Sequence, residues 1–278
     1  MKTQNLFLIS VIIFAALLFV VPHPFISAEL GNTLLTVLAF LFGIIAGFYI
    51  VVATTDYNSL KNILAEETAA WIALYRNVSI YDQVAAEKLS SLIDEYIIRA
   101  FDYEIIDYAK STGIEFDPIQ KFIRELPLKE NLSSVHEEIL ATMNKVITTR
   151  QQLTVLGTRT LSMFQWAVLM ALAALFIVSL YGLRTGELFF DIATVAVSSS
   201  IILILLLIRD LDLYVWNERT FGYDIFENVF RSIGKLPYYP AESIKKDRVT
   251  PSEKEYRIGT YINFPKSLDR KIEIHKSS

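Results

Sequence analysis

Three charged residues stand together where a long apolar run ends. The run closes in Arg209, Asp210 and Asp212, and the aromatic residues Tyr214 and Trp216 follow. Ionisable groups within a membrane helix mark ion paths or proton relays, whereas basic and aromatic residues together are typical of the membrane surface. We therefore predict an interfacial cluster at the inner mouth of whatever the membrane helices enclose. Neutralising Asp212 should then alter assembly or flux.

Small and hydroxyl-bearing residues inside two apolar runs form a second set of candidates. Gly43 and Gly47 make a GxxxG pattern, which lets membrane helices approach closely. Thr194 and Ser198 follow Asp191 at helical spacings of three and four. We take Gly43, Gly47, Thr194 and Ser198 as candidates for helix packing or for lining a pore.

Two opposite charges interrupt apolar seams outside the membrane runs. Glu67 falls within the heptad-like series Leu60, Leu64 and Trp71, and Arg150 interrupts the seam of a later helix. At 1.5 Å per residue both lie roughly 20 Å beyond their membrane runs. We predict a buried Glu67–Arg150 ion pair that sets helix register, because removing one partner of such a pair is costly.

Neither a catalytic nor a cofactor-binding pattern is present in the sequence. The three histidines, His23, His136 and His275, have no metal-ligand spacing, and there is no cysteine. Phosphate-loop, GxSxG and HExxH motifs are absent. The net charge of −4 indicates no nucleic-acid partner. We predict a protein that is not an enzyme and that needs no cofactor or metal.

Four apolar runs must position these residues, and they span Leu6–Val21, Leu34–Ala53, Met163–Leu183 and Leu188–Ile208. The last three have the length of membrane helices. Hydrophobic residues make up 53% of the chain and charged residues 20%, so part of the chain faces water. We expect four segments: helices one and two in residues 1–54, a water-facing segment in 55–162, helices three and four in 163–208, and a tail in 209–278.

The first run has two interpretations that the sequence leaves open. Lys2, an apolar stretch and "FISA" before Glu29 resemble a cleavable signal peptide. A retained first membrane helix, ended by Pro22 and Pro24, is the interpretation we favour.

The distribution of basic residues predicts orientation. Lys and Arg number eleven in residues 54–162 and thirteen from Arg209 onward, but only Arg184 lies in the short turn after the third run. Basic residues prefer the cytoplasmic side. We expect a multi-pass protein of the inner (plasma) membrane with both termini and the long middle segment in the cytoplasm.

The middle segment is predicted to be a helical hairpin built on membrane helices. The second helix should continue to about residue 78, and a helix starting near Asn131 should run unbroken into the third membrane run. Helices near residues 81–110 and 119–126 lie between them. Sixteen acidic residues outnumber eleven basic ones here, which suits cations better than anions. With an amphipathic helix from Phe221 and a short irregular tail, the fold class is all-α.

The order of these segments resembles the bestrophin-like membrane domain family, bacterial four-helix proteins of unknown function. The resemblance rests on "AFLFGIIAGFYIVVA" continuing into "EETAAWIALYRNV", then "LIDEYIIRAFDYE", "TTRQQLTVLGTRTLSMFQWAVLM" and "LIRDLDLY". It covers most of residues 1–225 and implies a distant relation to the oligomeric bestrophin anion channels. The family's usual Pro-Phe after Leu-Asp is missing, since Leu211-Asp212 is followed by "LYVWNERT". Bestrophin pore motifs are not recognisable.

Two functions follow from this organisation. One is an oligomeric ion channel or transport-related protein whose path is lined by the second or fourth membrane helix. The other is a membrane-anchored scaffold or signalling protein whose helical hairpin binds a cytoplasmic partner. The lipid bilayer and copies of the same chain are expected partners in both cases.

Overall fold

The computed structural model describes residues 3–22, 24, 26–105, 107–157, 161–214, 222–246 and 248–276. The chain forms two compact units. Unit 1 comprises Met1–Tyr57 and Thr160–Trp216, and unit 2 comprises Asn58–Arg159 and Asn217–Ser278. Helix α2 (Ala28–Tyr81) supplies residues to both units.

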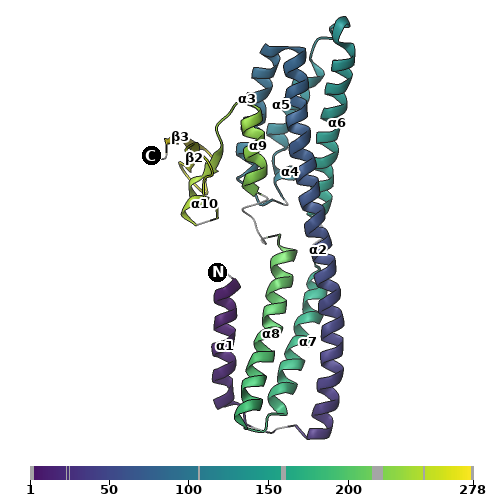
Figure 1. Cartoon of the computed structure of the whole chain (residues 1–278), viewed down its shortest axis with the longest axis vertical. Helices are drawn as coiled ribbons and strands as arrows, with labels where there is room; N and C mark the ends of the chain where they lie inside the picture. Colours follow the sequence, from purple (N-terminus) through teal and green to yellow (C-terminus); the bar gives the residue numbers. More distant parts are fainter. Residues whose placement is uncertain are drawn as a thin grey trace. The chain divides into compact units, whose positions relative to one another are not determined.

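Unit 1 consists of long apolar helices that lie side by side (Figure 1). They are α1 (Thr3–Val20), the first part of α2, α7 (Met163–Gly182) and α8 (Leu188–Asp212). Among the described residues, these four are the helices long and apolar enough to cross a membrane. The prediction of four long apolar helices is therefore confirmed.

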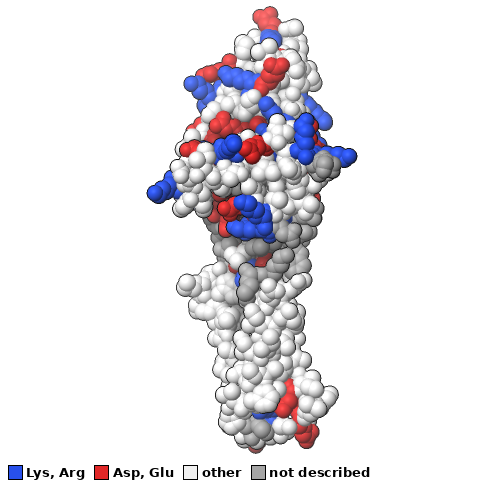
Figure 2. Space-filling view, turned by 90° about the vertical axis from the view of Figure 1, so that its left-hand side faces the viewer, with Lys and Arg blue, Asp and Glu red and all other residues white. Residues whose placement is uncertain are grey.

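The core of unit 1 joins α2, α7 and α8. Its buried residues recur every three or four positions, so that each helix turns one face inward. They are Leu38, Phe42 and Ala46 of α2, Leu169, Ala173 and Phe176 of α7, and Ile201, Leu205 and Ile208 of α8. The outer faces carry exposed apolar side chains, and Figure 2 shows that the visible surface of these helices is almost free of charge away from their ends.

The expected continuous helix from Asn131 into the third membrane run is wrong. Helix α6 (Ser133–Leu156) ends at Leu156, and α7 starts anew at Met163. The Ser162 hydroxyl accepts the backbone N–H of Gln165 (3.3 Å), and the Gln165 side chain accepts that of Ser162 (2.7 Å). This reciprocal capping box satisfies free N–H groups at a helix start, so it favours a new helix at this position.

The helices of unit 2 begin and end at other residues than the sequence suggested. They are the second part of α2, α3 (Gln83–Ala100), α4 (Tyr108–Ser111), α5 (Gly113–Arg124), a 3₁₀ turn η1 (Glu130–Leu132), α6 and α9 (Asp224–Ser232). The helix expected over residues 81–110 stops at Ala100, and α5 begins at Gly113 instead of near Ile119. Asp82 caps α3 by accepting the N–H of Ala85 at 3.0 Å.

The tail is not irregular, and the chain is not entirely helical. A three-stranded sheet has the order β1–β2–β3, with β1 (Tyr238–Pro240) parallel to β2 (Glu255–Tyr261) and β2 antiparallel to β3 (Arg270–Lys276). A short helix α10 (Ala241–Lys245) follows β1. Buried tyrosines 223, 239 and 256 form a small core with Val249. Arg257 of β2 also binds Asp94 of α3 through two hydrogen bonds of 2.8 and 2.6 Å, so the tail is part of unit 2.

Candidate functional site

The exposed face of α2 in unit 1 carries the two glycines of the GxxxG pattern. Phe42 and Ala46 turn into the core, whereas Gly43 and Gly47 turn outward. A β-carbon built on either glycine would meet no atom within 4 Å. Among the described residues, the two glycines therefore pack against no other helix of the same chain. Their face is open to a second copy, to lipid or to an ion path.

The hydroxyl residues of α8 lie on a different surface. Thr194 is 6% exposed and Ser198 is fully buried. The Ser198 and Ser199 hydroxyls have no hydrogen-bond partner among the described residues. Because Ser198 points inward and the glycines of α2 point outward, these candidates do not line one path within a single chain.

The charged cluster that ends α8 divides into two groups. Arg209 donates hydrogen bonds of 2.6 and 3.0 Å to the Asp210 carboxylate, which also accepts from the Thr3 hydroxyl. This group ties the end of α8 to the start of α1. Trp216, expected in the aromatic belt, lies outside the described residues.

Asp212 holds a separate connection within unit 1. Its carboxylate accepts the backbone N–H of Leu161 at 2.7 Å and the indole N–H of Trp166 at 3.2 Å. The side chain is largely buried, with 9% of the residue exposed. Asp212 thus joins the C-terminus of α8 to the first turn of α7.

Glu67 is fully buried in unit 2 and accepts three hydrogen bonds. The Trp71 indole donates at 3.3 Å and the Tyr96 hydroxyl at 3.0 Å to one oxygen, and the Tyr108 hydroxyl donates to the other. The Tyr96 hydroxyl also accepts from Arg150. The expected direct salt bridge is therefore corrected: Glu67 and Arg150 share a cluster, but Tyr96 stands between them.

Arg150 is 6% exposed and makes several contacts on its own side of the cluster. It donates to the Ala109 carbonyl at 2.6 Å and to the Thr112 hydroxyl at 3.2 Å. Its guanidinium carbon also lies 4.0 Å from the ring centre of Phe116, a cation–π contact. The tyrosines were missed because they sit on other helices, and nothing in the spacing of Glu67 and Arg150 points to them.

The electrostatics of this cluster follow from its burial. Burial raises the pKa of the Glu67 carboxyl, and the Tyr108 hydrogen bond and the Arg150 charge offset only part of that effect. Burial, followed by the nearby Glu67 charge, holds the pKa of Tyr96 and Tyr108 well above the usual range. Both hydroxyls therefore stay protonated and act as donors to the carboxylate.

Arg184 anchors the other end of unit 1. Its side chain is only 2% exposed, and its Nε lies 3.1 Å from an oxygen of Asp191. It also donates to the carbonyls of Leu18 (2.8 Å) and Val21 (3.2 Å), which end α1. A cation at a helix C-terminus is favourable. The lone basic residue of the α7–α8 turn is thus a cap for the first helix.

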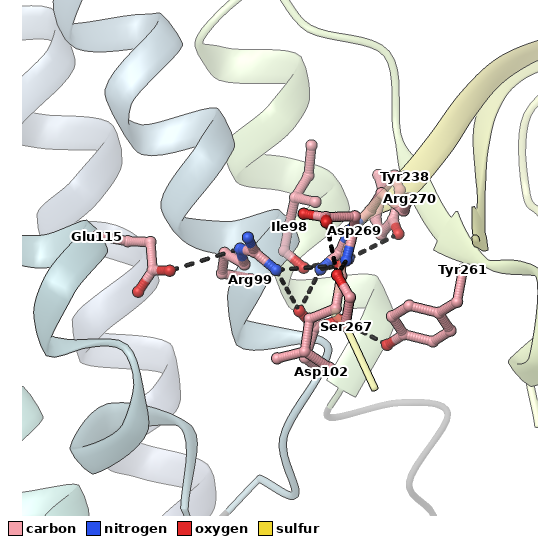
Figure 3. A network of polar contacts seen from close by, with 10 residues as sticks. Ile98, Arg99, Asp102, Glu115, Tyr238, Tyr261, Ser267, Asp269 and Arg270 are labelled. Atoms are coloured by element: carbon pink, nitrogen blue, oxygen red, sulfur yellow. Dashed lines mark hydrogen bonds and ion pairs between the residues drawn. The ribbon is translucent and has the colours of Figure 1, made fainter. Parts of the chain in front are cut away.

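A third polar network fixes the tail within unit 2 (Figure 3). Asp102 has no exposed side-chain surface and pairs with Arg270 of β3. It also accepts the Tyr261 hydroxyl at 2.6 Å, and Arg270 donates to the Ile98 carbonyl at 3.1 Å. Burial and the Asp102 hydrogen bond raise the pKa of Tyr261. The network connects β2 and β3 to the end of α3.

Comparison with known protein families finds one whose model matches most of this chain. Residues 5–213 match the bestrophin-like domain family. The chain belongs to the bestrophin-like family. Within the described residues, no three His, Asp or Glu side chains lie close enough together to hold a metal ion. No curated protein matches the chain in sequence.

Two solved structures share the fold. Both are single-substitution variants of a bacterial bestrophin homolog from Klebsiella pneumoniae. One has a TM-score of 0.61 at 12% identity and covers 82% of this chain and 99% of its own. The other has a TM-score of 0.56 at 12% identity and covers 84% and 99%. At this identity the likeness establishes the fold alone.

Proposed function

We propose that this bestrophin-like protein spans the inner membrane and assembles with copies of itself around an ion path. Its four long apolar helices and its family membership support the membrane location. Unit 2 holds 23 of the 26 Lys and Arg residues, whereas the α7–α8 turn holds only Arg184, and this distribution supports a cytoplasmic position for unit 2. The role is passive conduction or transport, without catalysis or a cofactor.

The exposed glycine face of α2 is the observation that supports assembly into an oligomer. Gly43 and Gly47 lie one helical turn apart, and large apolar side chains at Phe40, Ile44 and Phe48 flank them with 67%, 55% and 61% exposure. Glycines at this spacing let a second helix approach the backbone closely. Among the described residues, no helix of the same chain packs against these glycines. We propose that this face packs against a neighbouring copy or lines the ion path.

The ion is proposed to be a cation. No charged residue lies on α2 between Gly31 and Ala53, so the membrane part of this helix supplies no fixed charge. Residues 54–162, however, carry sixteen acidic against eleven basic side chains. A segment with an excess of carboxylates attracts cations and repels anions, and this charge balance is what supports a cation.

Reconstitution into ion-loaded vesicles tests the proposal. Wild-type protein should release monovalent cations under a gradient, and Gly47→Leu should reduce that flux at least about tenfold while the chain still folds. A β-carbon at Gly47 would meet no atom of the described residues within 4 Å, so an effect of this substitution in the folded protein points to contacts between copies or to the path. Ile44→Leu, on an adjacent exposed position, serves as the matched control with unchanged flux.

Two results would reject the channel function. The first is absence of flux for every ion at any gradient or voltage, with the protein shown to be inserted. The second is a monomeric mass in detergent, because four helices of one chain leave little room for a pore.

The scaffold alternative is favoured by one surface in unit 2. Strand β3 is an edge strand whose Ile272 and Ile274 side chains are 41% and 61% exposed. An exposed apolar edge is a template for pairing with another chain. A folded, inserted protein that conducts nothing, but captures a soluble protein in a manner abolished by Ile274→Lys, would support this alternative.

A further inference from the structure

A groove runs between α1 and α8 in unit 1, where Figure 1 shows the two helices adjacent. It has a volume of about 790 Å³. Val11 and Ala15 line one wall, and Ile192, Val195 and Ala196 line the other. From Phe7 to Phe19 the groove follows α1 for roughly 18 Å at 1.5 Å per residue. It is thus long and mostly apolar.

The groove opens toward the surface that a membrane would cover. Phe19 and Leu188 at its rim are 92% and 76% exposed, and Ile192 is 61% exposed. Its length is close to one leaflet of a hydrocarbon core that is about 30 Å thick. An extended acyl chain of one leaflet therefore matches the groove in both length and polarity.

One end of the groove is polar, and its accessible charge is negative. Arg184 faces inward, with 2% of its side chain exposed, and is engaged by α1 carbonyls and Asp191. The Asp191 side chain is 22% exposed, and Glu187 in the same turn is also exposed. The paired charges of Arg184 and Asp191 offset each other, so the exposed Glu187 carboxylate of the same turn leaves this end with a net negative charge. An ammonium headgroup complements that charge, and an anionic headgroup does not.

A buried polar group lies on the mostly apolar wall that α8 contributes. Ser199 lines it with a hydroxyl that is buried and has no hydrogen-bond partner among the described residues. The neighbouring Ser200 hydroxyl, by contrast, donates to the Ala196 carbonyl at 2.8 Å. An acyl chain offers this hydroxyl no partner, so the assignment of the lipid rests on the apolar walls and the charged end of the groove and not on Ser199.

We propose that this groove is a structural lipid site that binds a phospholipid with a primary ammonium headgroup. One acyl chain lies between α1 and α8, and the ammonium group lies beside Asp191. The site rests on the membrane location proposed above, but not on ion conduction. The lipid would fill the groove between α1 and α8.

Native mass spectrometry of the full-length protein tests the site, with phosphatidylethanolamine and phosphatidylglycerol as probes. Wild type should retain phosphatidylethanolamine after delipidation and should prefer it over phosphatidylglycerol by about tenfold. Ala15→Phe fills the groove and should lose that lipid. Ala16→Phe is the matched control, since Ala16 is exposed and does not line the groove, and it should retain the lipid. If Ala15→Phe does not fold, Ala196→Leu fills the opposite wall and replaces it.

Three outcomes would overturn the proposal. Equal retention by Ala15→Phe and Ala16→Phe would show that lipid binds elsewhere, and a preference for phosphatidylglycerol would contradict the role of Asp191. Because the chain has no cysteine, Ala196→Cys gives a single thiol. Disulfide-linked dimers of that variant would place a second copy in the groove instead of lipid. Release of every variant from membranes by alkaline washing would instead reject the membrane location itself.

Discussion

Removing the charge of Arg150 should destabilise unit 2 far more than removing a charge on its surface. Arg150→Met keeps much of the side-chain volume but removes the donors to Tyr96, Thr112 and the Ala109 carbonyl. Glu67 would then stay buried without an opposite charge. Breaking one side of such a buried pair costs about 3–5 kcal/mol. At about 2–4 °C per kcal/mol for a domain of this size class, Tm should fall by roughly 6–20 °C.

The loss should also depend on pH, with a sign set by the Glu67 pKa. Burial already raises this pKa above its ordinary value of 4.5, and the charge of Arg150 opposes the rise. Without that charge the folded-state pKa rises further. A group with a raised folded-state pKa stabilises the fold below its unfolded pKa and loses that contribution as pH rises through the folded pKa. Arg150→Met should therefore lose more stability relative to wild type at about pH 8 than at about pH 5.

Thermal unfolding followed by tryptophan fluorescence measures this effect, since Trp71 contacts Glu67 directly. Glu66→Gln is the matched control, because its carboxylate is 50% exposed and pairs with Lys145 at 2.5 Å on the surface. A surface pair of this kind contributes at most about 1 kcal/mol. Adding Glu67→Gln to Arg150→Met should remove most of the pH dependence. Equal Tm losses for Arg150→Met and Glu66→Gln, or a loss that does not change with pH, would refute the reasoning.

The remaining predictions concern the connections within each unit. The intact mass of the purified protein should show that α1 is retained. Cleavage after α1 would remove the carbonyls of Leu18 and Val21 that bind the buried Arg184. A mature chain that begins near Glu29 would contradict this prediction. Asp212→Asn should lower the free energy of unfolding by about 1–3 kcal/mol and shift tryptophan emission, because the new amide N–H group would face the N–H of Leu161 or of the Trp166 indole. Unchanged stability, assembly and flux would show that Asp212 only marks the end of the membrane helix. Gly259→Ala should speed proteolysis of the tail, because its β-carbon would overlap the Tyr238 hydroxyl. Gly113→Ala is the control, because its β-carbon would meet no described atom within 4 Å.

Local periodicity accounts for what the sequence predicted well. Apolar runs of membrane length become helices wherever they occur, because a helix satisfies its backbone hydrogen bonds within one segment. The 54-residue helix α2 follows from the same logic, since no proline interrupts it. The Glu67 and Arg150 positions were recognisable because each breaks an apolar seam. A seam, however, shows only that a polar side chain turns inward and does not show which partner meets it.

Features that depend on distant segments escaped prediction. The break between α6 and α7 depends partly on Asp212 at the far end of another helix, whereas the capping box of Ser162 and Gln165 is a local signal that the sequence reading overlooked. Strand β1 has three residues and pairs in parallel with β2 across an intervening helix, so its sequence alone carries little strand signal. The tail looked irregular because its order comes from these contacts with other segments.

The placement of charge in unit 1 constrains how an ion path there would select. Arg209 and Asp210 hold one end of α8 to α1, Asp212 holds that end to α7, and Arg184 with Asp191 holds the other end to α1. Between these ends, α1, α7, α8 and the membrane part of α2 carry no ionisable Asp, Glu, Lys or Arg side chain. A path through this region would thus offer backbone, hydroxyl and apolar groups without a fixed charge. Selection would then depend on the width of the α2 glycine face between copies, so widening that face should relax selectivity before it abolishes flux.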